Sequence, residues 1–149
     1  MKILMVCLGN ICRSPLAHGI LEDMVKKHKL DWLVDSAGTS AYHLGEKPCE
    51  GSINVAKRNG IKIDHFKAKQ FTANDLDEFD LILAMDNSNF SDMIRIATNE
   101  GQKRKIKMIL NYSFPNQNRA VPDSFYTGNY KEVFDLLYNA CQNIIERHS

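Results

Sequence analysis

Four short apolar segments of the chain are typical of strands that are buried on both faces. Residues 2–7 (KILMVC) form the clearest one, because the run is continuous and ends just before the turn-forming pair Gly9-Asn10. Residues 79–84 (FDLILA) give the next strongest signal. The other two segments are residues 32–37 and 106–110. The pattern therefore predicts four strands.

Apolar residues at helical spacing lie between and after these strands. One such stretch follows Ser14-Pro15 and continues to about residue 29. Ser14 is expected to cap this helix, and Pro15 is expected to be its first residue. Further helices are predicted over residues 50–59, over residues 88–97 and from residue 129 to the end of the chain.

Strands that alternate with helices predict the α/β fold class, with a parallel sheet covered by helices on both faces. The sequence has no internal repeat, low-complexity tract or linker. A chain of 149 residues is also large enough to bury a core without metal or disulfides. We therefore expect a single domain over residues 1–149.

Composition and charge exclude several classes of partner. A net charge of +1 provides no broad positive field for nucleic acid or for an acidic membrane surface. The densest basic run, residues 103–105, is interpreted as a solvated turn before a strand. No apolar run is long enough to span a membrane, and the N-terminal run is too short for a signal peptide. We therefore expect a cytoplasmic protein.

The four cysteines do not form the pattern of a disulfide-rich secreted domain. Cys7 and Cys12 lie close together, whereas Cys49 and Cys141 are isolated in the sequence. A zinc site needs three or four ligands at short spacings, and no second pair is present, so no metal is expected. A reducing compartment disfavours a structural disulfide. The close pair is therefore interpreted as catalytic, with a redox role for Cys12 in addition.

The stretch VCLGNICRSP, residues 6–15, combines the parts of an anion site. Ligands of parallel sheets bind beyond the carboxyl ends of the strands, where a loop meets a helix N-terminus. Gly9 and Asn10 supply the unusual backbone angles that let successive N–H groups converge on one anion. The helix N-terminus favours a thiolate at Cys7, and the planar guanidinium of Arg13 matches two phosphoryl oxygens. These residues predict phosphoryl transfer through a phosphocysteine.

The same stretch resembles the signature of the low-molecular-weight protein tyrosine phosphatases, in which Cys, five residues, Arg and then Ser or Thr lie near the N-terminus. The segments 36–39 (SAGT), 65–70 (HFKAKQ) and 121–123 (VPD) resemble later landmarks of that family. The resemblance implies a flavodoxin- or Rossmann-like four-stranded parallel sheet, the phosphotyrosine phosphatase I architecture. It also implies hydrolysis of phosphotyrosine in proteins or of small aryl phosphates, without a cofactor, by a monomer or weak dimer.

The resemblance further implies roles for individual residues. Cys7 attacks phosphorus, Arg13 holds the phosphoryl oxygens, and Asp123 donates a proton to the leaving oxygen before acting as a base. The remaining phosphate-binding residues are expected to be Leu8, Gly9, Asn10, Ile11, Cys12 and Ser14. Ser14 would also stabilise the thiolate.

Other residues are expected to support or surround this loop. Ser36 and His65, together with Asn10, resemble the hydrogen-bond network that holds the loop in shape. Aromatic side chains near the acid could line a slot for a phenyl ring. The expected aromatic rim comprises Tyr42, Phe125 and Tyr126.

The chain also departs from the family pattern. Ser124 follows the expected general acid, where the family usually has Pro, and this change should leave the acid loop less preorganised. Phe125 replaces a usual tyrosine. Cys49-Glu50-Gly51 replaces a usual Asp-Pro-Arg, which puts the start of the following helix in doubt.

Three other functions compete with phosphotyrosine hydrolysis. Arsenate reduction on the same scaffold uses further cysteines near the end of the third strand, and residues 79–97 contain none. Phosphoarginine phosphatases of similar sequence carry Thr where Ile11 stands, and Ile11 suits a flat apolar ring. A non-catalytic phosphoprotein-binding module could dispense with Cys7 and Asp123, yet both are present. For Cys12 we expect reversible protection of an oxidised Cys7.

Overall fold

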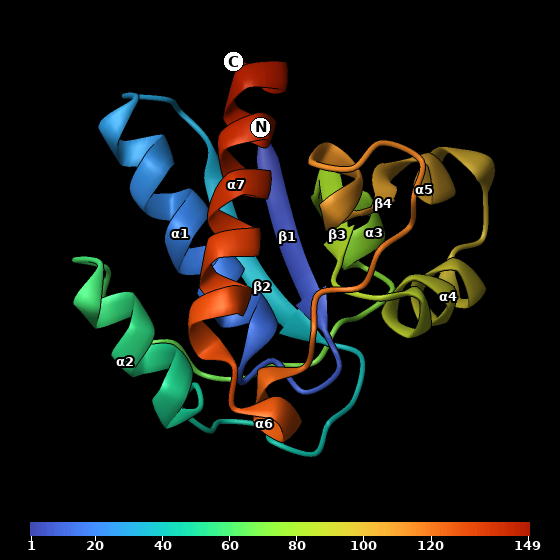
Figure 1. Cartoon of the computed structure of the whole chain (residues 1–149). Helices are drawn as coiled ribbons and strands as arrows, with labels where there is room; N and C mark the ends of the chain where they lie inside the picture. Colours follow the sequence, from blue (N-terminus) through green and yellow to red (C-terminus); the bar gives the residue numbers. More distant parts are fainter.

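The computed structural model describes residues 1–149 and contains a four-stranded parallel sheet in the order β2-β1-β3-β4 (Figure 1). The strands are β1 (Lys2–Cys7), β2 (Leu33–Gly38), β3 (Leu81–Ala84) and β4 (Ile106–Met108). β1 lies in the centre of the sheet and pairs in parallel with β2 and β3, so that Cys7 is opposite Gly38 and Val6 is opposite Ala84. The predicted four-stranded parallel sheet is confirmed.

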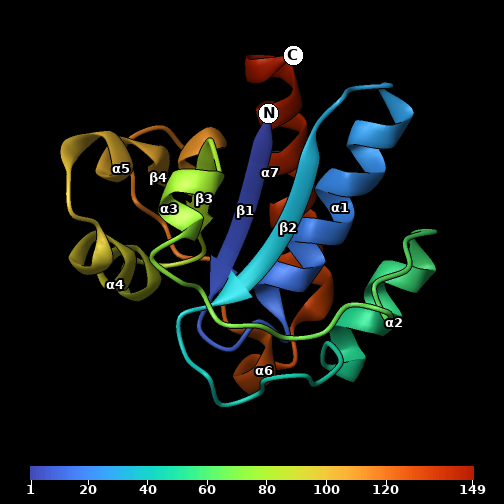
Figure 2. The ribbon, with the colours of Figure 1, turned by 180° about the vertical axis from the view of Figure 1, so that it is seen from behind.

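Helices cover both faces of this sheet, as the two opposite views in Figures 1 and 2 show. One face carries α1 (Arg13–Lys27) and the long C-terminal α7 (Tyr130–His148), with α2 (Glu50–Arg58) packed beside them. On the other face lie α3 (Asp75–Glu78) and α4 (Asn87–Ile96), and α5 (Glu100–Lys105) packs against α3 and β4. No helix combines the length and the apolar character that crossing a bilayer requires.

The alternation of side chains along β1 explains why that strand reads as one continuous apolar run. Ile3 and Met5 point into the core under α1 and α7, whereas Leu4 and Val6 point into the core under α3 and α4. All four side chains have no exposed surface. A central parallel strand has two buried faces, so apolar residues are favoured at every position.

Several predicted elements differ in detail from those observed. α1 begins at Arg13 rather than at the predicted Ser14-Pro15, and no side chain caps its first turn. The Ser14 hydroxyl is not available as a cap because it contacts Cys7 and Asn10. The fourth strand ends at Met108, after which the chain forms the 3-10 helix η1 (Ile109–Tyr112).

Two further predictions are corrected at helix boundaries. The basic run 103–105 lies in α5 rather than in a turn, because Asn99 caps that helix by accepting a hydrogen bond from the Gln102 amide. α4 is capped by Asp86 rather than by Asn87-Ser88. The start of α2 at Glu50 agrees with the predicted helix, despite the departure of residues 49–51 from the family pattern.

The carboxyl ends of β1, β2 and β3 meet at one edge of the sheet, where four connecting segments converge (Figures 1 and 2). These segments are the loop 8–12, the loop 39–49, the turn after β3 and the segment 121–128 that contains the short helix α6 (Ser124–Thr127). This is the edge at which parallel sheets bind ligands.

Candidate active site

The loop between β1 and α1, together with its flanking residues (7–14, the phosphate loop), is held by buried polar contacts. Asn10 adopts a left-handed backbone conformation, with φ of 56°. Its Nδ2 donates to Ser14 Oγ at 2.8 Å, and its Oδ1 accepts from the Lys69 amide at 3.0 Å. A Cβ atom on Gly38 would lie 2.7 Å from the Leu8 carbonyl oxygen, so β2 can approach the loop only through a glycine.

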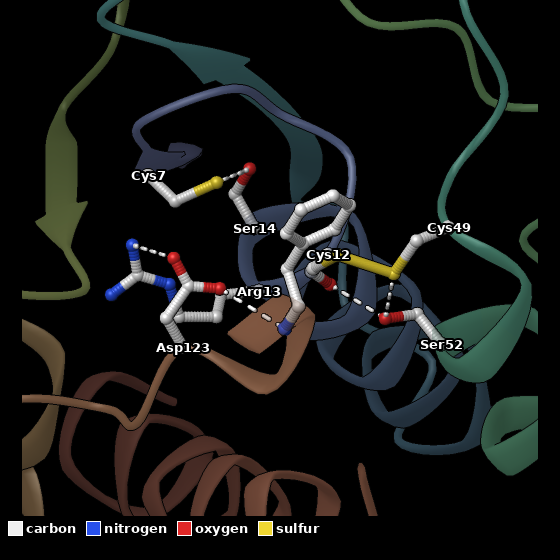
Figure 3. The surroundings of a disulfide bond; sticks show 8 residues. Cys7, Cys12, Arg13, Ser14, Cys49, Ser52 and Asp123 are labelled. Atoms are coloured by element: carbon white, nitrogen blue, oxygen red, sulfur yellow. Dashed lines mark hydrogen bonds and ion pairs between the residues drawn. A yellow bond between two sulfur atoms is a disulfide. The ribbon is translucent and has the colours of Figure 1, made fainter. Parts of the chain in front are cut away.

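Cys7 is the last residue of β1, and its thiol lies at the bottom of this loop. The residue is buried, and its Sγ lies 3.0 Å from Ser14 Oγ (Figure 3). Because Ser14 Oγ accepts from Asn10, its own proton remains to be donated. The acceptor can be either a Cys7 thiolate at 3.0 Å or the Ala37 carbonyl oxygen at 3.4 Å, and the sulfur is the nearer acceptor. Cys7 makes no disulfide. The thiol is therefore held in place and available for reaction.

The guanidinium of Arg13 is buried, with 4% of the residue exposed, and is anchored on one side. Its Nη1 donates to Asp86 Oδ2 at 2.8 Å and to the Val121 carbonyl oxygen at 3.1 Å. Its Nε and Nη2 make no hydrogen bond to the protein, so two parallel donors remain for an anion. Sequence reasoning assigned no role to Asp86; its position directly beyond a buried strand, at the carboxyl edge, was the available signal.

Asp123 reaches the same site from the segment 121–128, named here the acid loop. Its Oδ1 accepts from the Phe125 amide at 3.2 Å, which caps α6, and its Oδ2 lies 3.7 Å from Arg13 Nη2 (Figure 3). About a third of the side chain (32%) is exposed. Asp123 thus faces both the guanidinium and the solvent.

These residues line one pocket with an aromatic rim. Tyr42 and Tyr126 are 81% and 79% exposed, and Phe125 is also exposed, so their rings surround the entrance rather than fill the core. Ser40 and His43, which sequence reasoning missed, also contribute to the wall. The lining consists of Cys7, Leu8, Gly9, Ile11, Cys12, Arg13, Ser40, Tyr42, His43, Asp123, Phe125 and Tyr126.

The predicted role of His65 as a support for the loop is corrected by the structure. His65 is exposed, and its ring nitrogen lies 4.0 Å from the Asp64 carboxylate rather than against the phosphate loop. His18 instead bonds to Ser36, with 2.9 Å between His18 Nδ1 and Ser36 Oγ, and its ring stacks on Phe66 at 3.9 Å. The prediction failed because His18 lies on the buried face of α1, which brings it to β2, whereas the chain turns His65 outward.

The outer nitrogen of His18 contacts a carboxylate. His18 Nε2 lies 3.3 Å from Glu22 Oε2, one helical turn further along α1. This hydrogen bond is the main cause that lowers the pKa of Glu22, against the opposing effect of partial burial. A chain of polar contacts therefore leads from Ser36, in β2 opposite Met5 of β1, to the surface.

The expectation that the chain has no structural disulfide is also corrected. Cys12 and Cys49 form a disulfide, with 5.4 Å between their Cα atoms, across a sequence separation of 37 residues (Figure 3). The Cys49 amide donates to the Ile11 carbonyl oxygen at 2.6 Å, which places the first turn of α2 against the phosphate loop. The pair was not predicted because the two cysteines are 37 residues apart and Cys49 has no neighbouring cysteine in the sequence.

Cys141 provides a contrast within the same chain. It is fully buried under α1, and this burial raises the pKa of its thiol far above the ordinary value. It lines no part of the pocket and is a core residue. No group of three or more His, Cys, Asp or Glu side chains is arranged to hold a metal ion.

Comparison with known proteins places this geometry in a family. The family model for "Low molecular weight phosphotyrosine protein phosphatase" matches residues 2–148. The "Low molecular weight protein-tyrosine-phosphatase YfkJ" of Bacillus subtilis is 39% identical over 146 residues, which are 97% of this chain and 93% of that protein. The crystal structure of YfkJ has a TM-score of 0.92 at 38% identity, covering 99% of this chain and 93% of the other.

Two further solved structures are similar over nearly their full length. A protein tyrosine phosphatase from Entamoeba histolytica gives a TM-score of 0.91 at 34% identity, covering 99% of this chain and 96% of the other. DARP, a Drosophila arginine phosphatase, gives 0.92 at 30% identity, covering 100% and 98%. The chain therefore belongs to the low molecular weight phosphotyrosine protein phosphatase family, a family of hydrolases.

Proposed function

We propose that this protein hydrolyses phosphotyrosine, in proteins or in small aryl phosphates, through a phosphocysteine on Cys7. The observation that carries the proposal is the convergence of a free thiol, an anchored guanidinium and a carboxylate on one pocket. A binding module would need only the phosphate loop and Arg13. The presence of a nucleophile and a proton donor in addition favours an enzyme.

In the first step, the Cys7 thiolate attacks phosphorus while the bond from phosphorus to the phenolic oxygen breaks. The free Nε and Nη2 donors of Arg13 and the amides of the phosphate loop hold the three non-bridging oxygens. Asp123 donates its proton to the departing oxygen, so tyrosine leaves as the neutral phenol. Asp86 and the Val121 carbonyl oxygen keep the guanidinium in position during this step.

In the second step, water attacks the phosphocysteine and gives a proton to the Asp123 carboxylate. The bond between sulfur and phosphorus breaks, phosphate leaves, and Cys7 is released as a thiolate. The Ser14 hydroxyl, 3.0 Å from the sulfur, stabilises that thiolate as the leaving group. The proton on Asp123 is then ready for the next turnover.

The lining of the pocket supports an aryl substrate. Ile11 and Leu8 give the wall apolar surface next to the thiol, and Tyr42 and Tyr126 flank the entrance. A flat ring of tyrosine can pack between such groups, whereas the charged guanidinium of a phosphoarginine would lose water against Ile11. The resemblance to DARP keeps phosphoarginine as the second substrate to test. Arsenate is a third.

The test compares turnover of a phosphotyrosine peptide, a phosphoarginine peptide and arsenate by the intact chain and two variants. Cys7→Ser is expected to lower phosphotyrosine kcat by about 10⁴-fold or more, because the nucleophile is lost. Asp123→Asn is expected to lower it by about 10²- to 10⁴-fold, with loss of the pH dependence that the acid causes. Asp64→Asn removes an exposed carboxylate that does not line the pocket and should leave kcat unchanged.

Each component of the proposal can fail separately in this test. Unchanged phosphotyrosine turnover in Cys7→Ser would end the phosphocysteine mechanism. A Cys7-dependent activity that Asp123→Asn leaves unaffected at every pH would show that another group is the acid. Faster turnover of phosphoarginine or arsenate than of phosphotyrosine would move the substrate assignment to that compound.

A further inference from the structure

We propose that Cys49 is the terminal thiol of a three-cysteine relay, which returns an oxidised Cys7 to its active thiolate and leaves the oxidation in the Cys12–Cys49 disulfide. The relay uses a hydroperoxide as oxidant and an external dithiol as the final reductant. It rests on the proposed function only in taking Cys7 as the reactive thiol of the pocket. In this relay the Cys7–Cys12 disulfide is an intermediate, whereas from the sequence we expected Cys12 itself to provide the final protection of Cys7.

The position of Cys12 between the other two sulfurs carries the proposal. Cys12 and Cys7 line the same pocket, at the two ends of one loop, and Cys12 is already bonded to Cys49 (Figure 3). The Cys12 sulfur can therefore form a disulfide with either Cys7 or Cys49. Cys141 is buried elsewhere in the core and has no access to this group.

Cys49 has the surroundings of an attacking thiol. It precedes the first residue of α2, a helix of nine residues, where the helix dipole favours a thiolate. The Ser52 hydroxyl lies 3.2 Å from Cys49 Sγ and donates to the Cys12 carbonyl oxygen at 3.0 Å. Cys49 is partly exposed, unlike Cys12, so an external dithiol can reach it. Backbone and side-chain contacts thus hold it beside Cys12 independently of the disulfide.

The relay balances in three steps. First, the Cys7 thiolate attacks a peroxide oxygen, the O–O bond breaks, and an alcohol or water leaves as Cys7 becomes a sulfenic acid. Second, the Cys12 thiolate attacks the Cys7 sulfur, the S–O bond breaks, and the oxygen leaves as water after taking a proton. Third, the Cys49 thiolate attacks the Cys12 sulfur, the Cys7–Cys12 bond breaks, and Cys7 leaves as a thiolate.

The direction of the third step follows from the pairing observed, in which Cys12 and Cys49 form the bridge and Cys7 is free, and the leaving group is consistent with it. Thiol–disulfide exchange releases faster the sulfur that is better stabilised as a thiolate. Cys7 has the Ser14 hydroxyl at 3.0 Å and the N-terminus of α1 beside it. The bridge therefore moves away from Cys7, and the pocket regains its nucleophile while the chain stays oxidised. A dithiol then reduces the Cys12–Cys49 bridge and is itself oxidised to a disulfide.

The experiment follows disulfide connectivity and activity together. The fully reduced chain, freed of reductant, receives one equivalent of hydrogen peroxide, is alkylated and is mapped by mass spectrometry. After alkylation we expect a Cys12–Cys49 bridge and an alkylated Cys7. A portion of the sample assayed before alkylation should keep nearly full activity. In Cys49→Ser the reaction should stop at a Cys7–Cys12 bridge, with activity lost until a thiol is added. Serine is a good N-cap, so α2 keeps its start.

Two other variants separate the relay from direct oxidation of the pair. Cys7→Ser should form the Cys12–Cys49 bridge at least about tenfold more slowly, because the more reactive thiol is absent. Cys141→Ala should behave as the parent chain does. Bridge formation at the parent rate in Cys7→Ser, or a Cys7–Cys12 bridge as the stable product in the parent chain, would overturn the relay. The connectivity is read without a substrate, so absence of phosphotyrosine turnover would affect only the proposed function.

Discussion

The phosphate loop and the acid loop face the same pocket but are held in different ways. In the phosphate loop, buried side chains bond to one another, Asn10 to Ser14 and Ser14 to Cys7, and Asn10 also accepts from the partly buried Lys69 amide. In the acid loop, Asp123 is partly exposed and bonds within its own turn, and α6 is only four residues long. The phosphate loop is fixed by hydrogen bonds between its own buried side chains, whereas the acid loop is joined to the rest of the site through Val121 and through the contact of Asp123 with Arg13.

The difference matches the two tasks of a phosphoryl-transfer site. The charge on the three phosphoryl oxygens has the same shape for every substrate, so fixed donors stabilise it without reorganisation. The leaving oxygen belongs to the variable part of the substrate, and its acid must exchange protons with water between steps. We therefore expect perturbation of the phosphate loop to affect all substrates and perturbation of the acid loop to affect mainly stability and proton transfer.

The largest effect is expected from Asn10→Ala. The change removes the hydrogen bonds to the buried Ser14 hydroxyl and from the partly buried Lys69 amide, and it puts alanine, which tolerates the left-handed region less well than asparagine, at φ of 56°. Loss of these contacts should destabilise the fold by about 2–4 kcal/mol, and inorganic phosphate should bind about tenfold more weakly, because the loop amides lose their arrangement. Urea unfolding and phosphate inhibition of turnover measure the two effects.

Asn10→Gly is the matched control for this prediction. Glycine accepts the left-handed conformation but makes neither hydrogen bond, so it should keep about 1 kcal/mol more stability than alanine while losing the same phosphate affinity. Parent-like phosphate affinity in both variants would contradict the idea that the side chain of Asn10 preorganises the loop.

The contrast also explains what the sequence could predict. The central strands β1 and β3 were predictable because both of their faces are buried and favour apolar residues, and the phosphate loop was predictable because its chemistry is contiguous in residues 7–14. The family resemblance, rather than any local pattern, singled out Asp123 from the other aspartates. The aromatic rim was predicted in the same way, and all three of its rings line the pocket.

The contacts that the sequence did not reveal join residues that are far apart along the chain. The Arg13–Asp86 pair spans 73 residues, and the Cys12–Cys49 disulfide spans 37. His18 was missed, and His65 was chosen wrongly, because hydrophobic periodicity places a helix but does not say which polar residue on its buried face finds a partner. Such partners depend on the packing of α1 against β2.

A smaller effect is expected from Ser124→Pro, which acts on the acid loop alone. Ser124 is the first residue of α6, where proline is favoured, and its buried hydroxyl has no hydrogen-bond partner. Fixing φ and removing that hydroxyl should raise stability by about 0.4–1 kcal/mol, which is a rise in Tm of up to about 4 °C. Differential scanning calorimetry measures the shift.

Ser124→Ala separates the two causes, since it removes the hydroxyl without fixing φ. The proline variant should exceed it in Tm, and both variants should bind inorganic phosphate as the parent does. A changed phosphate affinity in Ser124→Pro would contradict the expectation that changes in the acid loop affect mainly stability and proton transfer.

The smallest effect is expected from Glu22→Gln, at the outer end of the contacts that lead from Ser36 through His18. The hydrogen bond from His18 lowers the pKa of Glu22 in the folded state. The charged Glu22 therefore stabilises the fold at pH values above its unfolded pKa, near 4.5. This stabilisation is lost as the pH falls through the folded pKa. Because the side chain is half exposed, solvent screening limits the contribution to below about 1 kcal/mol.

Urea unfolding of the parent and of Glu22→Gln, at pH values from about 6 down to 3, measures this contribution. The parent should lose more stability than the variant on acidification, and Glu146→Gln, an exposed glutamate on α7, should behave as the parent does. Phosphate affinity at neutral pH should be equal in all three proteins, because Ser36 keeps its bond to His18 whether or not Glu22 is charged. An affinity that follows the charge of Glu22 would show that the phosphate loop depends on this surface contact as well as on its buried hydrogen bonds.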